Sequence, residues 1–457
     1  MEKELLYKQK SAYEIISDDE VKKAYDYCED YKKYLNASMT ERLAVKTAIN
    51  LAEKAGFREF QPGKEYKAGD KIYKNIRKKA LILAVIGKMP IEAGLNIAGA
   101  HVDAPRLDLK QVPMYEDSEI AFFKTHYYGG IRKYQWVALP LALHGVVALM
   151  DGSTVDVSIG DEENDPIFVI TDLLPHLAAD QNKKTLGEGI TGEALNIVIG
   201  SAPDKEAEKD KVKYNILKIL NEKYGITEED FLSAELEAVP ALKAKDVGFD
   251  RSMIGAYGHD DRVCAYAELR AIMECQAPEK TAICILADKE EIGSEGVSGM
   301  QSQAFESFVS ELCKIQGADM YRCFENSFCI SADVLNAFDP TYPEVSEKRN
   351  NAKINYGLGV CKFTGARGKS GSNDASAEVI GKIRRMFKED GVVWQLGELG
   401  KVDQGGGGTI AKFMANRNID TIDAGVPVLS MHAPYELVSK LDCYMTYKGM
   451  AALYKSK

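Results

Sequence analysis

The segment TAICILADKEEIGS, residues 281–294, places an acidic pair directly after an apolar run. The part TAICILA, residues 281–287, is short and uninterrupted, which is typical of a strand buried on both faces. Acidic pairs usually lie on exposed helices, but Glu290 and Glu291 follow the carboxyl end of this strand, where α/β proteins place their functional sites. One carboxylate can hold a metal ion while its neighbour takes a proton from water. The segment therefore predicts an α/β fold with a metal-assisted site; an ordinary exposed acidic pair without such a site is the alternative.

Outward from this segment, strand-like and helix-like stretches alternate along the chain. Strands that alternate with helices predict a mixed, mostly parallel sheet flanked by helices, which is the α/β class. The expected elements are helices within 1–55 and at 262–275, 302–315, 374–389 and 409–416, and strands at 80–87, 94–101, 281–287, 327–334 and 420–433.

The region 106–249 has a different texture, with short strand-like pieces separated by turns, such as STVDVSIG at 153–160. Within it, the charged stretch 204–230 carries apolar residues at helical spacing and predicts an amphipathic surface helix. The simplest organisation is one discontinuous α/β domain, residues 1–105 and 250–457, interrupted by a β-rich domain at 106–249.

The composition predicts a globular protein that binds neither nucleic acid nor membranes. It has 457 residues, 45% hydrophobic and 28% charged, with a net charge of -11. A chain this acidic is a poor general binder of phosphate backbones. The longest apolar run, 136–150, is interrupted and too short to span a bilayer. Nine cysteines without a CxxC pair and a start without an apolar signal segment predict reduced thiols and a cytoplasmic location.

Histidines and carboxylates recur beside other predicted strands and helices. His101 and Asp103 point to the same face of an extended segment, so Asp103 can orient the ring of a metal-binding His101. Asp260 and Asp261 precede a helix, where they can bind a cation or cap the helix. Two further apolar strands end near possible ligands, Asp333 and His432. Each group alone has a structural explanation, but together they predict one convergent cluster. HExxH, GxSxG and Walker motifs are absent from the sequence.

Six segments resemble those of the aspartyl aminopeptidase and vacuolar aminopeptidase I family of co-catalytic zinc exopeptidases: GAHVDAPRLDLK, GHDDRVCAYAEL, DKEEIGSEG, SADVLNAFDP, SGSNDASAEV and PVLSMHAPYEL. The resemblance covers nearly the whole chain, including the β-rich insert. It implies a metalloaminopeptidase with two divalent ions, zinc or else manganese or cobalt. Glutamyl-type aminopeptidases, carboxypeptidases and deacylases share this architecture, and a non-catalytic assembly protein on the same scaffold is a further alternative.

The resemblance implies a role for each residue of the cluster. Glu290 would be the general base that takes a proton from a water activated by both metal ions, and Asp103 would orient His101. His101 and His432 would bind different ions, with Asp260, or else Asp261, as the bridging ligand. The complete implied ligand set is His101, Asp260, Glu291, Asp333 and His432.

The resemblance also implies substrate contacts outside this cluster. His176, in the segment LLPHLAADQ, would reach the site of a neighbouring subunit, or else lie near the metals. Arg367 or Lys369 would read an acidic substrate side chain, while the preferred N-terminal residue, acidic or apolar, stays open. Gly407, in the run GGGGT at 405–409, would approach the substrate backbone with N–H groups available to an oxyanion. The insert would serve dimerisation and substrate gating, with dimers assembling into a tetrahedral dodecamer.

Overall fold

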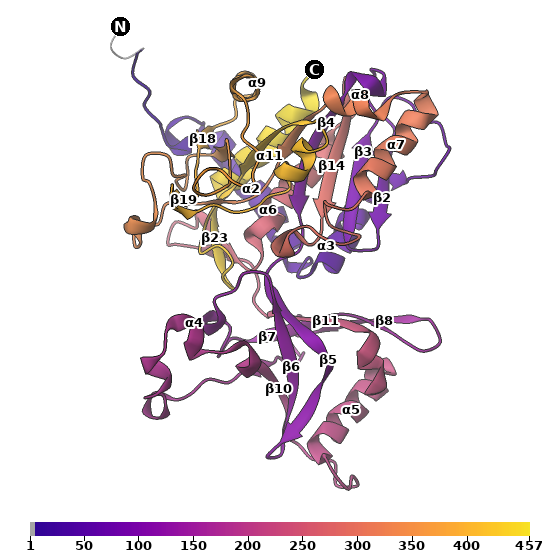
Figure 1. Ribbon diagram of the computed structural model, residues 1–457, viewed down its shortest axis with the longest axis vertical. Helices are drawn as coiled ribbons and strands as arrows, with labels where there is room; N and C mark the ends of the chain where they lie inside the picture. Colours follow the sequence, from indigo (N-terminus) through magenta and orange to yellow (C-terminus); the bar gives the residue numbers. More distant parts are fainter. Residues whose placement is uncertain (1–4) are drawn as a thin grey trace. The chain divides into compact units, whose positions relative to one another are not determined.

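The computed structural model describes residues 5–457, which fall into two compact units (Figure 1). Unit 1 holds the described residues up to Asp103 together with Ala244–Met431 and Tyr435–Lys457. Unit 2 holds Ala104–Lys243 and the short segment His432–Pro434. Among the described residues, no helix combines the length and the apolar character that a membrane crossing requires.

Unit 1 is built on a nine-stranded sheet with the strand order β1-β2-β3-β14-β4-β15-β21-β17-β18. Its central strands β14, β4, β15 and β21 are parallel. Strand β3 is antiparallel to its neighbour β14, and β17 is antiparallel to its neighbour β21. This sheet confirms the predicted mixed, mostly parallel α/β class. The strands are β1 (Arg58–Glu59), β2 (Lys71–Ile76), β3 (Ala80–Val85), β4 (Leu95–His101), β14 (Thr281–Ala287), β15 (Phe328–Ser331), β17 (Leu358–Cys361), β18 (Trp394–Leu396) and β21 (Asp420–Gly425).

Strand β14 is buried along its whole length because helices cover both faces of the sheet. Its alternate residues enter two separate apolar cores: Ala282, Cys284 and Leu286 enter one core, and Ile283 and Ile285 enter the other. This double burial explains why TAICILA is an unbroken apolar run rather than an alternating one.

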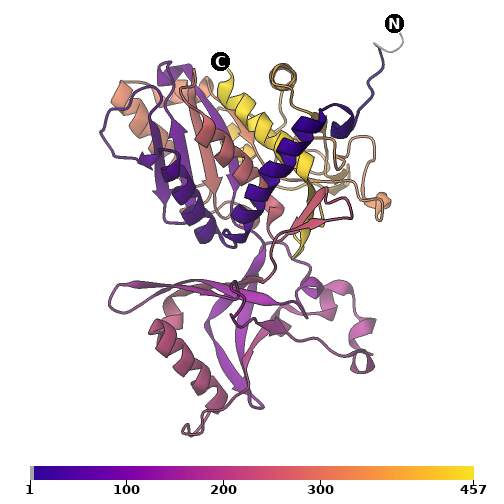
Figure 2. The same cartoon turned by 180° about the vertical axis from the view of Figure 1, so that it is seen from behind.

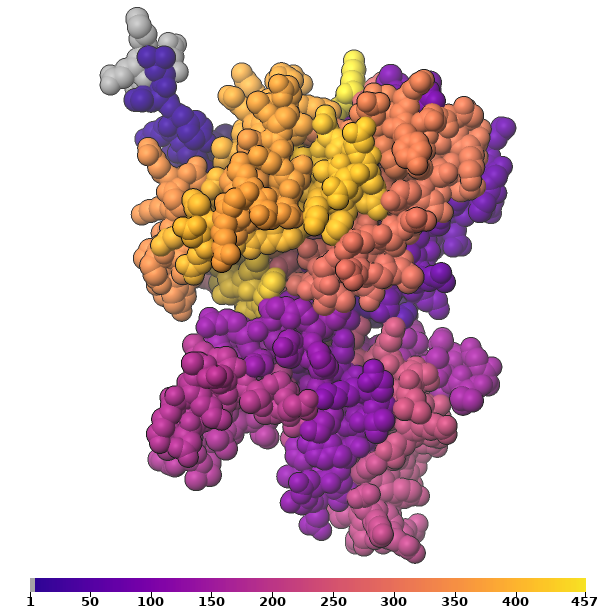
Figure 3. Space-filling model, in the orientation of Figure 1, coloured from indigo at the N-terminus to yellow at the C-terminus, as the bar shows by residue number. Residues whose placement is uncertain are grey.

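The two helical layers differ in size. The first core is covered by α2 (Asp18–Asn36), α3 (Glu41–Lys54), α6 (His259–Glu274), α9 (Ala377–Glu389) and α11 (Lys440–Lys455). Figure 2 shows α2, α3 and α11 on this side of the sheet. The second core is covered by α7 (Ala304–Gln316), α8 (Met320–Glu325) and α10 (Ala411–Ala415). Figure 3 shows that the side chains of residues 304–325 spread over this opposite face of unit 1.

A five-stranded sheet beside the first has the order β12-β13-β23-β22-β16. The predicted strand or strand pair at 420–433 is divided between the two sheets, because β21 belongs to the large sheet and β22 to the small one. A two-stranded ribbon, β19 and β20, lies in the segment before α10. These strands are β12 (Lys245–Val247), β13 (Met253–Ala256), β16 (Leu335–Asn336), β19 (Gly400–Lys401), β20 (Gln404–Gly405), β22 (Pro427–Leu429) and β23 (Glu436–Ser439).

Unit 2 is a seven-stranded antiparallel sheet with the order β8-β7-β11-β5-β6-β10-β9. Helix α5 (Lys211–Tyr224) lies where the sequence predicts an amphipathic helix, and Glu116 of β5 accepts hydrogen bonds of 2.9 Å from the N–H groups of Val212 and Lys213 in its first turn. The strands are β5 (Arg106–Asp117), β6 (Ile120–Tyr128), β7 (Leu141–Ala148), β8 (Thr154–Ile159), β9 (Val169–Ile170), β10 (Asn196–Gly200) and β11 (Ala234–Pro240).

Candidate metal centre

The carboxyl ends of three neighbouring strands bring polar side chains together in unit 1. His101 ends β4, and its register partner on β14 is Ala287, just before Asp288 and the acidic pair. Strand β15 ends at Ser331 on the other side of β4, two residues before Asp333. Ligand atoms of His101, Asp260 and Asp333 lie within 4.8 Å of one another. The parallel centre of the sheet thus produces the convergent cluster that the strand ends predict.

His101 is 1% exposed and presents one ring nitrogen to this cluster. Its Nδ1 lies 3.0 Å from the main-chain oxygen of Asp103, which can only accept, so Nδ1 carries the proton. Its Nε2 lies 3.1 Å from Asp260 Oδ1. Burial by itself lowers the pKa of His101, but hydrogen bonds to Asp103 and Asp260 and the charge of Glu290 outweigh burial and hold this pKa well above its usual value. The ring is therefore oriented for contact with a cation through Nε2.

Asp103 has a second contact that sequence reasoning missed. Its two carboxylate oxygens accept hydrogen bonds of 3.2 Å from the backbone N–H groups of Glu290 and Glu291. These residues begin the short turn Glu290–Ile292. One carboxylate thus contacts both the ring of His101 and the backbone of the acidic pair. The whole insert lies between Asp103 and Glu290 in the sequence. No local pattern signals such a contact.

The segment His259–Arg262 holds the cluster from the side of α6. The backbone N–H of Asp260 donates to Glu436 at 3.1 Å, and Asp261 Oδ2 accepts from the N–H of His101 at 3.4 Å. The Nε of Arg262 donates to the Val102 carbonyl at 3.1 Å. The backbone at Asp260 and Asp261 is not helical, so regular helix begins only after these two residues, and the helix-cap interpretation of the aspartates is not contradicted.

The donor set of this cluster fits divalent metal ions. Burial, followed by the charge of Asp261, raises the pKa of Asp333 well above its usual value. Burial also raises the pKa of Asp261, and the charge of Asp260 adds to that increase. Carboxylates that raise each other's pKa in a buried space are stabilised by a cation, and imidazole with carboxylates is a common zinc donor set. His101, Asp260 and Asp333 would together hold one such ion.

The acidic pair lies beside this donor set. Glu290 Oε2 is 3.7 Å from His101 Nε2, and the Glu290 side chain is 15% exposed. A carboxylate oxygen of Glu291 lies within 4.8 Å of one of Asp260. His432 belongs to unit 2, where its Nδ1 is 3.0 Å from the Gly130 carbonyl oxygen. That contact assigns the proton to Nδ1 and the lone pair to Nε2, so the ring has the tautomer that a metal ligand needs; its role as a ligand stays a prediction.

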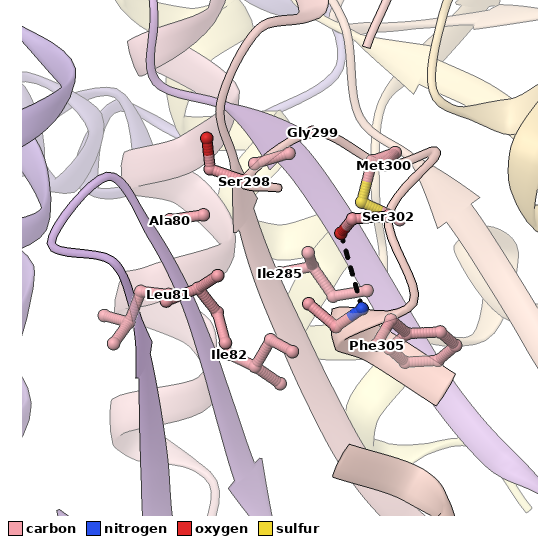
Figure 4. A pocket seen from close by; sticks show the side chains of 12 residues that line it. Ala80, Leu81, Ile82, Ile285, Ser298, Gly299, Met300, Ser302 and Phe305 are labelled. Atoms are coloured by element: carbon pink, nitrogen blue, oxygen red, sulfur yellow. Dashed lines mark hydrogen bonds between the residues drawn. The ribbon is translucent and has the colours of Figure 1, made fainter. Parts of the chain in front are cut away.

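Asp288, which directly follows β14, accepts a 2.5 Å hydrogen bond from Ser298. This bond holds the segment after the acidic pair against the end of β14. An apolar hollow lies behind this segment (Figure 4), where Ser302 accepts from the N–H of Ala304. The residues that line the hollow are uncharged, among them Leu81, Ile285 and Phe305. The hollow therefore does not belong to the polar cluster.

The predicted substrate-binding residues differ in whether their polar groups already contact other residues of the protein. Lys369 pairs with Asp374 at 3.1 Å, and its Nζ lies 4.0 Å from the ring centre of Phe363. Among residues 5–457, no carboxylate lies within ion-pair distance of the exposed Arg367 side chain. The N–H of Gly407 donates to the Thr364 carbonyl at 2.9 Å, so this N–H already has a partner, while contact of the run 405–409 with substrate stays a prediction.

His176 lies in unit 2 on the short turn Pro175–Leu177, where its side chain is exposed. Exposed leucines surround it in sequence: Leu173 and Leu174 are each 50% exposed and Leu177 is 68% exposed. A histidine among exposed apolar side chains is compatible with a contact to another chain, which stays a prediction.

Known proteins resemble this chain over nearly its whole length. A family model described as aminopeptidase I zinc metalloprotease (M18) matches residues 34–454. A protein of Clostridium acetobutylicum named "Probable M18 family aminopeptidase 1" is 50% identical over 461 residues, covering 99% of each chain. A crystal structure of an M18 aminopeptidase from Thermotoga maritima has a TM-score of 0.94 at 42% identity, covering 99% of this chain and 100% of its own. A dodecamer of S. cerevisiae mApe1 shares the fold, with a TM-score of 0.76 at 20% identity over 93% of this chain and 96% of its own.

Proposed function

From the premise that the chain belongs to the aminopeptidase I zinc metalloprotease family (M18), we propose that it removes the N-terminal residue of peptides at a centre of two divalent metal ions. Membership makes it a zinc metalloaminopeptidase. The observation that carries the finer proposal is the cluster of His101, Asp260 and Asp333 at the carboxyl ends of β4 and β15 and the start of α6, with the acidic pair beside it.

We propose two overlapping ligand sets. His101, Asp260 and Asp333, whose donor atoms lie within 4.8 Å of one another, would hold one ion. Asp260, Glu291 and His432 would hold the other. Asp260 is the bridge in this proposal because its Oδ1 is 3.1 Å from His101 Nε2, whereas Asp261 uses Oδ2 on the backbone of His101. Zinc is the family metal, while carboxylate-rich pairs of sites also accept manganese or cobalt.

The proposed chemistry assigns the proton transfers to Glu290. Bound metal ions would lower the pKa of a water molecule and polarise the scissile carbonyl. Glu290 then accepts the proton of the attacking water and later delivers it to the leaving amine. Its position supports this role, because its carboxylate is 3.7 Å from His101 Nε2 and its side chain is partly open to solvent.

The experiment that tests this function compares two substrate classes on the zinc-loaded enzyme: aminoacyl-nitroanilides with a free amine, and N-acyl amino acids. We expect cleavage of the free-amine substrates alone, and loss of that activity on chelation with recovery on adding zinc. Cleavage of acyl amino acids alone would instead favour a deacylase or carboxypeptidase on the same scaffold. A zinc-binding chain that cleaves neither class would favour a non-catalytic assembly protein.

Substrate preference belongs to the same proposal. If the enzyme prefers acidic N-terminal residues, Arg367 is the better candidate to pair with them, because Lys369 already pairs with Asp374. If it prefers apolar residues, neither cation is needed. The glycine-rich segment 405–409 would border the substrate without using the N–H of Gly407.

Assembly completes the proposal. We propose that residues 106–249 serve dimerisation and gating, that His176 completes the site of a neighbouring copy, and that dimers assemble into a tetrahedral dodecamer. The related mApe1 structure is a dodecamer, and the exposed leucines around His176 provide an apolar contact surface. A cytoplasmic location likewise stays a prediction.

A further inference from the structure

His259, which precedes the proposed bridging aspartate, is a buried polar residue that the proposed reaction does not use. Its side chain is completely inaccessible to solvent. It begins α6, but the hydrogen bonds of its ring are to α2 and β13 and not to the metal cluster. A buried imidazole beside a metal ligand therefore requires a separate explanation.

Both ring nitrogens of His259 have partners, and their chemistry fixes the direction of each hydrogen bond. His259 Nε2 lies 3.1 Å from the carbonyl oxygen of Ile254, which can only accept, so Nε2 carries the proton. Nδ1 then has the lone pair and must accept. Its partner at 2.8 Å is the hydroxyl of Tyr31, which therefore donates. The chain of bonds runs from Tyr31 through His259 to Ile254.

These two bonds hold the residue next to Asp260 between separate elements. Tyr31 lies on α2, is 0% exposed, and is 228 positions away in the sequence. From the other direction, Glu436 of β23 accepts the backbone N–H of Asp260 at 3.1 Å. The backbone that presents the Asp260 carboxylate is thus fastened on both sides by buried hydrogen bonds.

We propose that Tyr31 and His259 are positioning residues that fix the Asp260 carboxylate for metal binding. This inference rests on the proposed function, because it takes Asp260 as a metal ligand. Groups that orient metal ligands typically change metal affinity by about ten- to a hundredfold when they are removed. Tyr31→Phe removes a single oxygen atom and leaves His259 Nδ1 without its donor, while the ring stays in the core.

The chain offers a matched control one helical turn further along α2. Tyr34 is 2% exposed and packs on Tyr266 with ring centres 5.1 Å apart, as Tyr31 does at 5.5 Å. Among the described residues, no hydrogen bond joins Tyr34 to His259 or its neighbours. Tyr34→Phe therefore removes the same atom from the same kind of environment without touching the support of Asp260.

The test measures the dissociation constant for Zn²⁺ by chelator competition on metal-free, full-length protein. We expect Tyr31→Phe to raise this constant by about tenfold or more and Tyr34→Phe to change it by less than about twofold. Tyr31→Phe should also lower the thermal midpoint of the metal-free protein, because it leaves a buried acceptor unsatisfied, so the rise caused by zinc is measured against each variant's own metal-free midpoint. His259→Gln should weaken zinc binding at least as much, and adding Tyr31→Phe to it should cost little more, because both changes break one chain of bonds.

Equal zinc affinities for Tyr31→Phe and Tyr34→Phe, or additive losses in the double variant, would overturn the inference. Two other results would contradict the proposed function instead. Wild-type protein could take up no zinc, or an Asp260→Asn variant could bind zinc as tightly as wild type. Either outcome removes Asp260 as a ligand and the inference with it.

Discussion

Asp103 is the residue on which two parts of the proposed metal centre depend. Its Oδ1 lies 3.3 Å from His101 Nδ1, and its two oxygens accept the N–H groups of Glu290 and Glu291. This carboxylate is fully buried, so protein donors take the place of water around it. The orientation of the metal-binding histidine and of the acidic pair are therefore coupled through one side chain.

Asp103→Asn tests this coupling. The amide keeps one acceptor oxygen but turns a donor toward an N–H group or toward His101 Nδ1, so one of the three contacts becomes repulsive. We expect zinc affinity and kcat each to fall by about ten- to a hundredfold. Metal titration and steady-state kinetics measure the two effects. A loss of zinc affinity without any change in kcat at saturating zinc would show that Asp103 orients His101 but not Glu290.

Glu290→Gln separates proton transfer from metal binding. The amide has nearly the same shape but cannot accept the proton of water, so we expect kcat to fall by about a hundred- to ten-thousandfold. Zinc content, measured by elemental analysis, should stay at the wild-type value. Glu291→Gln is the matched comparison, because there we expect zinc itself to be lost. A Glu290→Gln variant with wild-type turnover would remove Glu290 from the mechanism.

Arg367→Gln and Lys369→Gln compare the two candidate cations for substrate. Lys369 is held by Asp374 and by the ring of Phe363, whereas Arg367 is exposed. If acidic residues are preferred, Arg367→Gln should lower kcat/KM for glutamyl-nitroanilide by about tenfold or more, as expected for loss of a charge-assisted hydrogen bond. Leucyl-nitroanilide serves as the internal control. A larger effect of Lys369→Gln would reverse the assignment.

At the scale of elements, β15 and β21 are joined beneath the proposed centre by a polar pair. Ser331 and Asp423 are register partners on these parallel strands, and the Ser331 hydroxyl donates to Asp423 at 2.8 Å. Burial raises the pKa of Asp423 to about 6, although hydrogen bonds from Thr409 and Ser331 oppose the shift. In the folded protein, the carboxyl group of Asp423 therefore ionises at a higher pH than it does in the unfolded chain.

This shift predicts a pH-dependent contribution to stability. The pKa of Asp423 is 3.8 in the unfolded chain and about 6 in the folded one, so the folded state holds the proton more tightly. The stabilisation is fully present below the unfolded value and is lost as pH rises through about 6. Asp423→Asn, which keeps the oxygen acceptor and cannot ionise, should remove this loss. Urea unfolding of metal-free wild type and variant at about pH 4 and pH 7 measures the difference, since ΔΔG between them should change over this interval. A pH-independent ΔΔG would contradict the prediction.

At the scale of the whole molecule, the two compact units contribute different residues to the proposal. Unit 1 supplies His101, Asp260, Asp333 and the acidic pair, whereas His176 and His432 belong to unit 2. His176 lies on a turn among exposed leucines, and its action on another copy of the chain stays a prediction.

Complementation between inactive chains tests whether sites are shared. Glu290→Gln retains His176 and His176→Ala retains Glu290, so each homo-oligomer should have strongly reduced kcat with wild-type zinc content. After dissociation and joint reassembly, mixed oligomers should regain activity, because a site can combine Glu290 of one chain with His176 of the next. Recovery measured against each variant reassembled alone provides the control. Full activity in monomeric wild type, or no recovery in mixed oligomers that are shown to form, would defeat the shared site.

The amino-acid sequence by itself determined the α/β class, the surface helix within the β-rich region, and the position of the acidic pair at a strand end. These features follow from local periodicity: TAICILA is apolar throughout because both faces of β14 are covered, and that pattern is visible in seven consecutive letters. The roles assigned to His101, Asp260, Glu290, Glu291, Asp333 and His432 remain predictions.

Only the tertiary structure decided which side chains meet. The contacts of Asp103 with Glu290 and Glu291 and of Tyr31 with His259 cannot be read from periodicity. The same holds for the Gly407 N–H, which the fold commits to the Thr364 carbonyl. The physical reason is that a hydrogen bond requires atoms within about 3 Å in a defined orientation. For residues separated by a hundred positions or more, that placement is fixed by the packing of whole elements and not by their neighbours in the sequence.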